Sequence, residues 1–124
     1  MARVLIVDDE DDIRLLLRLQ LSAAGHEVLE SPGGAEAIAA LHDEGTPRPD
    51  CLVLDLRMPQ VDGWTVLDEV RQSEELAELA VLLVSAHADA KDRERSRDLG
   101  AADLLAKPVS QGDLVDAISR VVTN

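Results

Sequence analysis

The chain has 124 residues, 46% of them hydrophobic, which suits one globular domain with its own core. Its 25 acidic residues outnumber 12 basic ones, and the formal net charge of -13 repels nucleic acid and anionic membranes, so we expect neither as a direct partner. No apolar run approaches the roughly 20 residues that span a bilayer, and the first run is too short for a signal peptide. The lone Cys51 sits in an apolar run, as a buried thiol does in a reducing compartment, so we expect a cytoplasmic protein.

The first predicted elements are a buried strand at residues 4–7 and an amphipathic helix after it. The strand is continuous and aliphatic, which is typical of a strand covered on both faces. The core face of the helix is expected to carry Ile13, Leu16, Leu17, Gln20, Leu21 and Ala24, which recur with a period of 3.6. Gly25 supplies its C-terminal stop. Of the acids between strand and helix, Asp11 and Asp12 fit the first turn, where the helix dipole favours negative charge.

Four more strand and helix pairs follow. The predicted strands are a weak one at residues 27–30 and buried ones at 51–54, 81–84 and 104–106. The predicted helices cover residues 35–41, a segment marked by Val66, Leu67 and Val70, the charged residues 88–99, and a last segment that begins at Ser110 with Asp113 in a capping-box-like position. This alternation predicts an α/β fold: a parallel sheet with right-handed crossovers and helices on both faces.

Polar residues with suitable chemistry follow each of the four predicted buried strands. Asp8 and Asp9 come after the first, Asp55 after the third, Ser85 after the fourth and Lys107 after the fifth. Ligands of such sheets bind beyond the carboxyl ends of the strands, so these side chains should meet there. Two like charges ~4 Å apart repel by about 4 kcal/mol at an effective dielectric near 20. Three carboxylates therefore need a counterion, and Mg²⁺ fits their oxygen ligands.

The same residues have the chemistry for phosphoryl transfer to an aspartate. A carboxylate can accept a phosphoryl group as an acyl phosphate, while a hydroxyl and an ammonium bind other phosphoryl oxygens. Catalysis would then rest on positioning and charge neutralisation. Singly, each residue has a simpler explanation as a turn former, a helix cap or a solvated charge. The hypothesis depends on all four strand ends carrying suitable groups together.

Over essentially its whole length the chain resembles the receiver domain of response regulators in two-component signalling, the CheY-like domain. The matching motifs are Asp8-Asp9, Asp55, Met58-Pro59, Gly63, Ser85-Ala86 and Lys107-Pro108. The resemblance implies a flavodoxin-like, doubly wound sheet of five parallel strands in the order 2-1-3-4-5, with five helices in a single domain. It also implies that a histidine kinase or histidine phosphotransfer domain donates a phosphoryl group.

The resemblance further implies a role for each site residue. Asp55 is the phosphoacceptor, and Asp9 and Asp55 ligate Mg²⁺, or Mn²⁺ as a substitute, together with the backbone carbonyl of Arg57. Asp8 binds the ion through water. Ser85 and Lys107 contact the phosphoryl oxygens, and the Lys107-Pro108 bond is expected to be cis, which is cheap only before proline.

The chain departs from the family at Leu104, where receivers usually have Tyr or Phe. That aromatic side chain turns inward when the hydroxyl residue moves, so leucine predicts a muted or differently carried conformational change. Arg57 and His87 stand two residues after Asp55 and Ser85, at positions that influence acyl phosphate lifetime in this family. Arg57 could screen the phosphoryl group from water, or it could form a surface salt bridge of little energetic value.

Leu15 and Leu19 lie i, i+4 on the first helix, on the face away from the core. They are either scattered exposed leucines, which are ordinary, or, with Ile13, an apolar patch for docking a helical histidine phosphotransfer domain. We expect residues 1–124 to form a receiver without an output module, acting on an unknown downstream protein as a monomer or weak dimer.

Two other classes remain possible. A phosphohydrolase with an aspartyl nucleophile shares these groups but normally needs a cap or a larger substrate pocket. A phosphorylation-independent adaptor on the same fold would lose parts of the acidic cluster, Asp55 or Lys107, all of which are present. We therefore expect a signalling phosphoacceptor, with no enzymatic activity beyond its own phosphotransfer and dephosphorylation.

Overall fold

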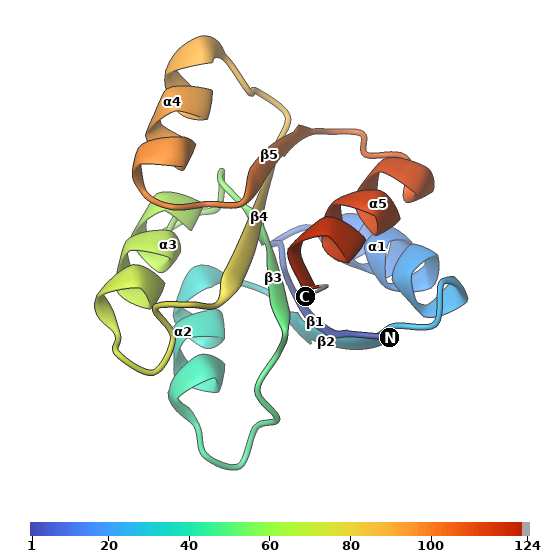
Figure 1. The fold of residues 1–124 in the computed structure, drawn as a ribbon, viewed down its shortest axis with the longest axis horizontal. Coiled ribbons are helices and arrows are strands. Elements are labelled where there is room, and N and C mark those ends of the chain that lie inside the picture. The colour runs from blue at the N-terminus through green and yellow to red at the C-terminus, as the bar shows by residue number, and fades with distance from the viewer. Residues whose placement is uncertain (123–124) are drawn as a thin grey trace.

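The computed structural model describes residues 1–122 and contains every strand and helix predicted from the sequence (Figure 1). The strands are β1 (Arg3–Val7), β2 (Glu27–Ser31), β3 (Cys51–Asp55), β4 (Ala80–Ser85) and β5 (Asp103–Ala106). The helices are α1 (Asp11–Ala23), α2 (Gly34–His42), α3 (Gly63–Gln72), α4 (Ala90–Asp98) and α5 (Gln111–Val122).

All strand pairs are parallel, and the sheet order is β2-β1-β3-β4-β5, which confirms the predicted fold class. Helices α1 and α5 cover one face of the sheet, and α2, α3 and α4 cover the other (Figure 1). Strand β2 lies on one side of β1, whereas β3, β4 and β5 extend the sheet on its other side. The carboxyl ends of β1 and β3 therefore flank the switch point where such sheets bind ligands.

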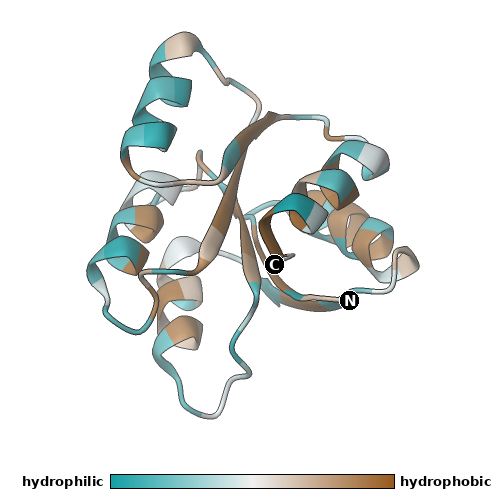
Figure 2. Cartoon of the chain, in the orientation of Figure 1, coloured by the Kyte–Doolittle hydropathy of each residue, from teal (hydrophilic) through white to brown (hydrophobic). Residues whose placement is uncertain are grey.

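Each face of the sheet has its own hydrophobic core, because alternate strand residues point to opposite sides. Val4, Ile6 and Val53 pack with α1 and α5, whereas Leu5 and Leu52 pack with α2 and α3. The central strands are the brown centre of Figure 2. Strand β3 is buried at every residue, which explains its unbroken aliphatic sequence. The edge strand β2 is only half-buried, and its sequence signal is correspondingly weaker.

Helix α1 buries a narrower stripe than predicted. Leu17 and Leu21 are buried as expected, but Leu16 is 47% exposed and Ala24 is exposed as well, so the assignment of these two residues to the core was wrong. Leu16 lies one residue step, about 100° around the helix, from Leu17 and falls outside the contact stripe. Asp11 and Asp12 occupy the first turn, and Gly25 follows the helix with φ 91°, both as predicted.

Helix α4 is attached mainly by polar contacts. Ser96 is its only buried residue, and the helix is almost wholly hydrophilic in Figure 2. Arg93 Nη1 donates to the carbonyl of Leu104 at 3.1 Å, and the Arg95 guanidinium lies 4.3 Å from the ring centroid of Trp64. Helix α4 therefore buries little apolar surface, and its arginine side chains make much of its contact with the rest of the domain.

The predicted start of the last helix is confirmed. Helix α5 begins after Ser110, whose Oγ accepts a hydrogen bond from the Asp113 amide at 3.1 Å. Within residues 1–122, no helix is long and apolar enough to cross a membrane.

Candidate functional site

Three carboxylates from two strand ends meet at the switch point. Asp8 and Asp9 follow β1, and Asp55 ends β3. One oxygen from each lies within 4.8 Å of the others. Asp8 and Asp55 are buried, with 1% and 4% exposure, whereas Asp9 is exposed and opens the cluster to solvent. The predicted convergence of Asp8, Asp9 and Asp55 is therefore present.

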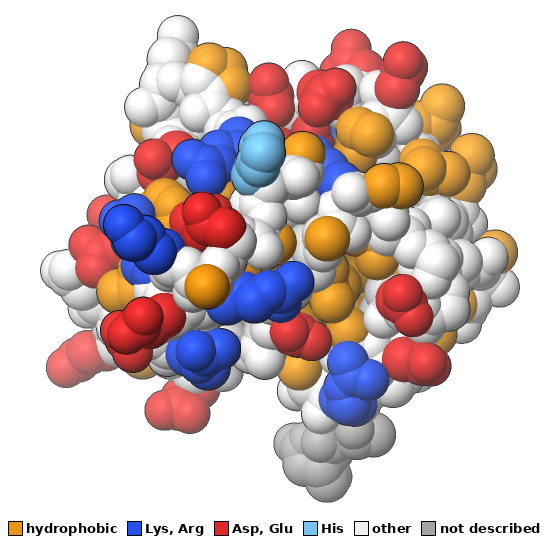
Figure 3. All heavy atoms as spheres, turned by 90° about the horizontal axis from the view of Figure 1, so that it is seen from above, with side chains coloured by type: hydrophobic (Ala, Val, Ile, Leu, Met, Phe, Trp, Pro, Cys, Tyr) orange, Lys and Arg blue, Asp and Glu red, His pale blue; other side chains and the backbone are white. Residues whose placement is uncertain are grey.

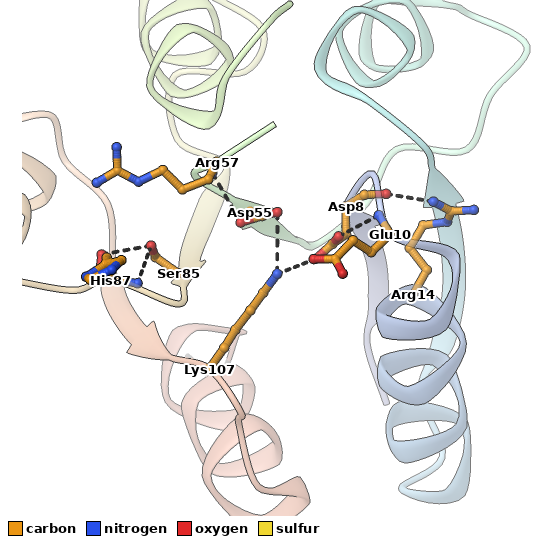
Figure 4. A network of polar contacts seen from close by, with 8 residues as sticks. All are labelled: Asp8, Glu10, Arg14, Asp55, Arg57, Ser85, His87 and Lys107. Carbon is orange, nitrogen blue, oxygen red and sulfur yellow. Dashed lines mark hydrogen bonds and ion pairs between the residues drawn. The ribbon is translucent and has the colours of Figure 1, made fainter. Parts of the chain in front are cut away.

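Lys107 reaches the same cluster from the end of β5 and partly neutralises it. Its Nζ lies 2.9 Å from Asp8 Oδ2 and 3.4 Å from Asp55 Oδ2 (Figure 4). Burial alone would lower the pKa of Lys107, but the hydrogen bond to Asp8 and the charge of Asp55 outweigh it and leave the pKa raised. Lys107 is therefore a firmly charged cation between two buried carboxylates.

The environment of Asp55 opposes its ionisation. Burial, and then the negative charge of Asp8, raises its pKa above the ordinary value, while Lys107 and the Arg57 amide act in the opposite direction. A carboxyl with a raised pKa favours folding at acid pH, and this contribution is lost as the pH rises through the raised value. A cation bound beside Asp55 would favour its ionised form and so oppose the rise in its pKa.

Backbone amides fix the orientation of the two buried carboxylates. Glu10 N donates to Asp8 Oδ1 at 2.9 Å, and Arg57 N donates to Asp55 Oδ1 at 3.2 Å. The second oxygen of each carboxylate faces Lys107. Arg14 Nη1 donates to the Asp8 carbonyl at 2.7 Å and ties the strand end to α1.

Gly63 packs closely against the backbone of Asp55 and Leu56. Its amide donates to the Leu56 carbonyl at 3.0 Å. A Cβ at this position would lie 2.5 Å from the Asp55 carbonyl oxygen and 2.7 Å from Leu56 Cα. Met58 is buried and Pro59 exposed in the same loop.

The loop after β5 has the expected geometry at Pro108, since the Lys107-Pro108 peptide bond is cis. Leu104, in β5 itself, is 3% exposed and belongs to the core on the α2 and α3 side of the sheet. The residue that replaces the usual aromatic is thus a packed core leucine.

Ser85 lies at the same edge, but its hydroxyl is turned to the following loop. Ser85 Oγ donates to the His87 carbonyl at 2.8 Å and accepts from the His87 amide at 3.1 Å. Ser85 is fully buried, whereas Ala86 and His87 are exposed. Figure 4 shows Ser85 beside His87, away from Asp8. Ser85 thus lies at the predicted strand end, but its hydroxyl is hydrogen-bonded to His87 and not to the carboxylates.

The side chain of Arg57 forms a salt bridge, which was one of its two predicted roles. Its Nη2 lies 3.2 Å from Asp92 Oδ2 on α4. Sequence reasoning missed Asp92 as a neighbour of the site, because the residue is one of many charges on α4 and its partner depends on where that helix packs.

The predicted docking residues lie on α1 as expected. Leu15 and Leu19 are 46% and 58% exposed, and Leu16 adds to the same surface. Ile13 is half-buried against the core beneath α1 and α5. Figure 3 shows hydrophobic side chains gathered on the α1 side of the molecule, whereas charges of both signs cover the α4 side. We call Leu15, Leu16 and Leu19 the α1 leucine patch.

The fold and site together define a doubly wound α/β domain with an acidic cluster at the carboxyl ends of its parallel strands. The sequence matches the response regulator receiver domain over residues 4–119, so the chain belongs to this family. Receiver domains bind Mg²⁺ at an acidic pocket and interact with histidine kinases.

Relatives of known sequence carry this domain within longer proteins. The transcriptional regulator ycf27 of Galdieria sulphuraria is 38% identical over 112 residues, which are 90% of this chain and 42% of the relative. The DNA-binding dual master transcriptional regulator RpaA of Synechocystis is 35% identical over 121 residues, 98% of this chain and 48% of the relative. The chain thus spans about half the length of these relatives.

Solved structures agree with the fold. A response regulator from Chloroflexus aurantiacus superposes with a TM-score of 0.90 at 32% identity, covering 99% of this chain and 98% of that one. The Mn²⁺-bound form of the response regulator Rcp1 has a TM-score of 0.80 at 28% identity and covers 98% of this chain and 89% of that one.

Proposed function

We propose that Asp55 accepts a phosphoryl group from the phosphohistidine of a histidine kinase or histidine phosphotransfer domain. The observation that carries this proposal is the position of the Asp55 carboxylate, which shares one small space with Asp8, Asp9 and Lys107. An Asp55 oxygen attacks phosphorus, the new O–P bond forms, and the N–P bond to the histidine breaks. The released imidazole takes its proton from solvent.

The donor set at the site fits a divalent cation. Three carboxylate oxygens within 4.8 Å of one another carry more negative charge than Lys107 neutralises, and hard cations prefer such ligands. We assign Asp9, Asp55 and the Arg57 carbonyl to direct binding of Mg²⁺ and Asp8 to binding through water. A bound ion would supply positive charge to neutralise the phosphoryl oxygens, and Mn²⁺ could take the place of Mg²⁺.

Lys107 and Ser85 are the proposed ligands of the other phosphoryl oxygens. Lys107 already stands against Asp55 and would bind an oxygen of the incoming group as a point charge. Ser85 would exchange its bond to the His87 carbonyl for one to the phosphoryl group. Leu104 would remain packed during this exchange, so we expect the signal to reach the surface without an aromatic rotamer change. Attack of water on phosphorus would then break the O–P bond, release inorganic phosphate and return Asp55 to the carboxylate.

The hydrolase alternative is weaker because the sequence matches the receiver family over residues 4–119. The adaptor alternative does not explain why all three carboxylates and Lys107 are held together at the cost of a raised pKa at Asp55. Output by protein binding fits the net charge of -13, which disfavours direct contact with nucleic acid.

The test is intact mass after incubation with acetyl phosphate. With Mg²⁺ we expect one added phosphoryl group, and with a chelator none. Asp55→Asn should gain nothing, whereas Asp50→Asn, an exposed aspartate before the same strand, should gain one group as the parent does. A phosphoryl group that survives Asp55→Asn would rule out this acceptor, and rapid turnover of unrelated phosphate monoesters would favour the hydrolase.

We further propose that the α1 leucine patch, with the half-buried Ile13 beside it, docks the helices of the phosphohistidine donor. Among residues 1–122, three of the four exposed large hydrophobic residues belong to this patch, and α1 begins shortly after Asp8 and Asp9. Apolar side chains at helical spacing fit the groove between two donor helices. A donor held there would present its histidine to the carboxyl ends of β1 and β3.

Leu19→Asp should slow phosphoryl transfer from a phosphohistidine domain about tenfold, since a buried interface anchor is worth about 1–2 kcal/mol. The rate with acetyl phosphate should stay unchanged, because this donor needs no docking surface. Ala39→Asp, at an exposed position on α2, is the matched control and should affect neither rate. Equal slowing with both donors would show that Leu19 acts through the fold instead.

A further inference from the structure

Arg57 links the proposed phosphoacceptor to α4. Its amide donates to Asp55 Oδ1 at 3.2 Å, while its guanidinium lies 3.2 Å from Asp92 Oδ2 in the first turn of α4. In Figure 4 the guanidinium points away from the Asp55 carboxylate and from Lys107. The side chain is therefore held off the site by an acid from another element.

This ion pair is weak enough to be exchanged. The Arg57 side chain is 59% exposed, and Asp92 is 14% exposed. An ion pair with one partner in solvent is screened by water and salt and holds its side chains only loosely. A phosphoryl group on Asp55 would add about -2 charge and three acceptor oxygens within the arginine's own neighbourhood. Guanidinium binds such oxygens in a planar, two-pronged arrangement, so Asp92 and the phosphoryl group would compete for one cation.

We propose that Asp92 is a positioning residue that competes with the phosphoryl group on Asp55 for the Arg57 guanidinium, and thereby sets the lifetime of the acyl phosphate. The inference rests on the proposed function, because it concerns the group carried by Asp55. In the decay step, water attacks phosphorus and the O–P bond to Asp55 breaks, which yields the carboxylate and inorganic phosphate. A guanidinium over the phosphoryl oxygens obstructs the water, whereas one paired with Asp92 does not.

The experiment measures the decay of the phosphorylated chain. Each protein is phosphorylated with acetyl phosphate and Mg²⁺, freed of the donor by desalting, and followed by intact mass. Asp92→Ala should lengthen the half-life about two- to fivefold, the fold-change that release from an exposed ion pair allows. Arg57→Ala should shorten it, and adding Asp92→Ala to Arg57→Ala should change nothing more. Asp92→Glu keeps the carboxylate and should therefore retain the parent half-life.

Glu94→Ala is the matched control, since it removes one negative charge from an exposed position on the same helix. Its half-life should equal that of the parent. An unchanged half-life in Asp92→Ala overturns the inference, as does an Asp92 effect that persists without Arg57, because the residue would then act through the fold of α4. If the parent chain accepts no phosphoryl group, the proposed function fails and the inference with it. If the parent is phosphorylated normally but the Asp92 variants decay with the parent half-life, only the role of Asp92 is overturned and the proposed function stands.

Discussion

Lys107→Met should lower the free energy of unfolding by about 3 kcal/mol at pH 7.5 without Mg²⁺, because the substitution removes one partner of a buried ion pair. Lys107 is the only cation in contact with both Asp8 and Asp55 among the described residues. Without it, two buried carboxylates and Asp9 repel one another with no counter-charge. The expected loss is at the lower end of the range for buried pairs, since exposed Asp9 leaves the site open to water.

Acid and Mg²⁺ should each reduce this loss. Lys107 opposes the rise in the pKa of Asp55, so the pKa is higher still in the variant. A carboxyl with a raised pKa favours folding below that pKa, and the variant should therefore approach the parent as the pH falls. Mg²⁺ should stabilise the variant more than the parent, because no ammonium competes for the carboxylates.

Urea unfolding of the parent and variant, with and without Mg²⁺ and over a pH series, measures both effects. Lys91→Met is the matched control, because Lys91 is the other lysine of the chain and is exposed on α4. Its stability should stay within about 0.5 kcal/mol of the parent. Similar losses for the two lysines, or a smaller Mg²⁺ effect in Lys107→Met, would contradict the assigned charge balance.

The fold was predictable because its signals are local and agree with one another. Strand β3 is apolar at residues 51–54 because both of its faces are covered, and Gly25 and Gly100 stand after helices with φ of 91° and 81°. Leu16 was misplaced because helical periodicity alone does not say how wide a stripe the neighbouring elements cover.

The sequence predicts which strand ends meet at the site, but it does not predict how their side chains pair. Parallel topology brings Asp8, Asp55 and Lys107 to one edge whatever the details of packing. The 2.9 Å contact of Lys107 with Asp8, instead of with Asp55 alone, depends on side-chain rotamers. The partner of Arg57 depends on the seating of α4, and no local pattern in the sequence encodes that placement.

Gly63→Ala should damage both the stability of the domain and the chemistry of Asp55. The added methyl carbon would lie 2.5 Å from the Asp55 carbonyl oxygen, and this backbone atom cannot rotate away as a flexible side chain would. Overpacking of this kind costs about 1–3 kcal/mol, and we expect the upper end because the neighbouring atoms belong to β3 and the residue after it. Relief of the contact must move the backbone that carries Asp55. A displacement near 1 Å at a reacting group can cost about 10²-fold in rate.

We therefore expect Gly63→Ala to lose about 3 kcal/mol in urea unfolding and to take up phosphoryl from acetyl phosphate about 10²-fold more slowly at saturating Mg²⁺. Gly112→Ala is the matched control, because its added carbon meets nothing within 4 Å and lies in the first turn of α5. Alanine there should keep the parent rate and add up to about 0.5–1 kcal/mol of stability. If Gly63→Ala takes up phosphoryl at the parent's rate, the loop that contains residue 63 accommodates the methyl group without moving Asp55. The position of the acceptor would then be set by the amide of Arg57 and by Lys107, and the glycine would matter for folding alone.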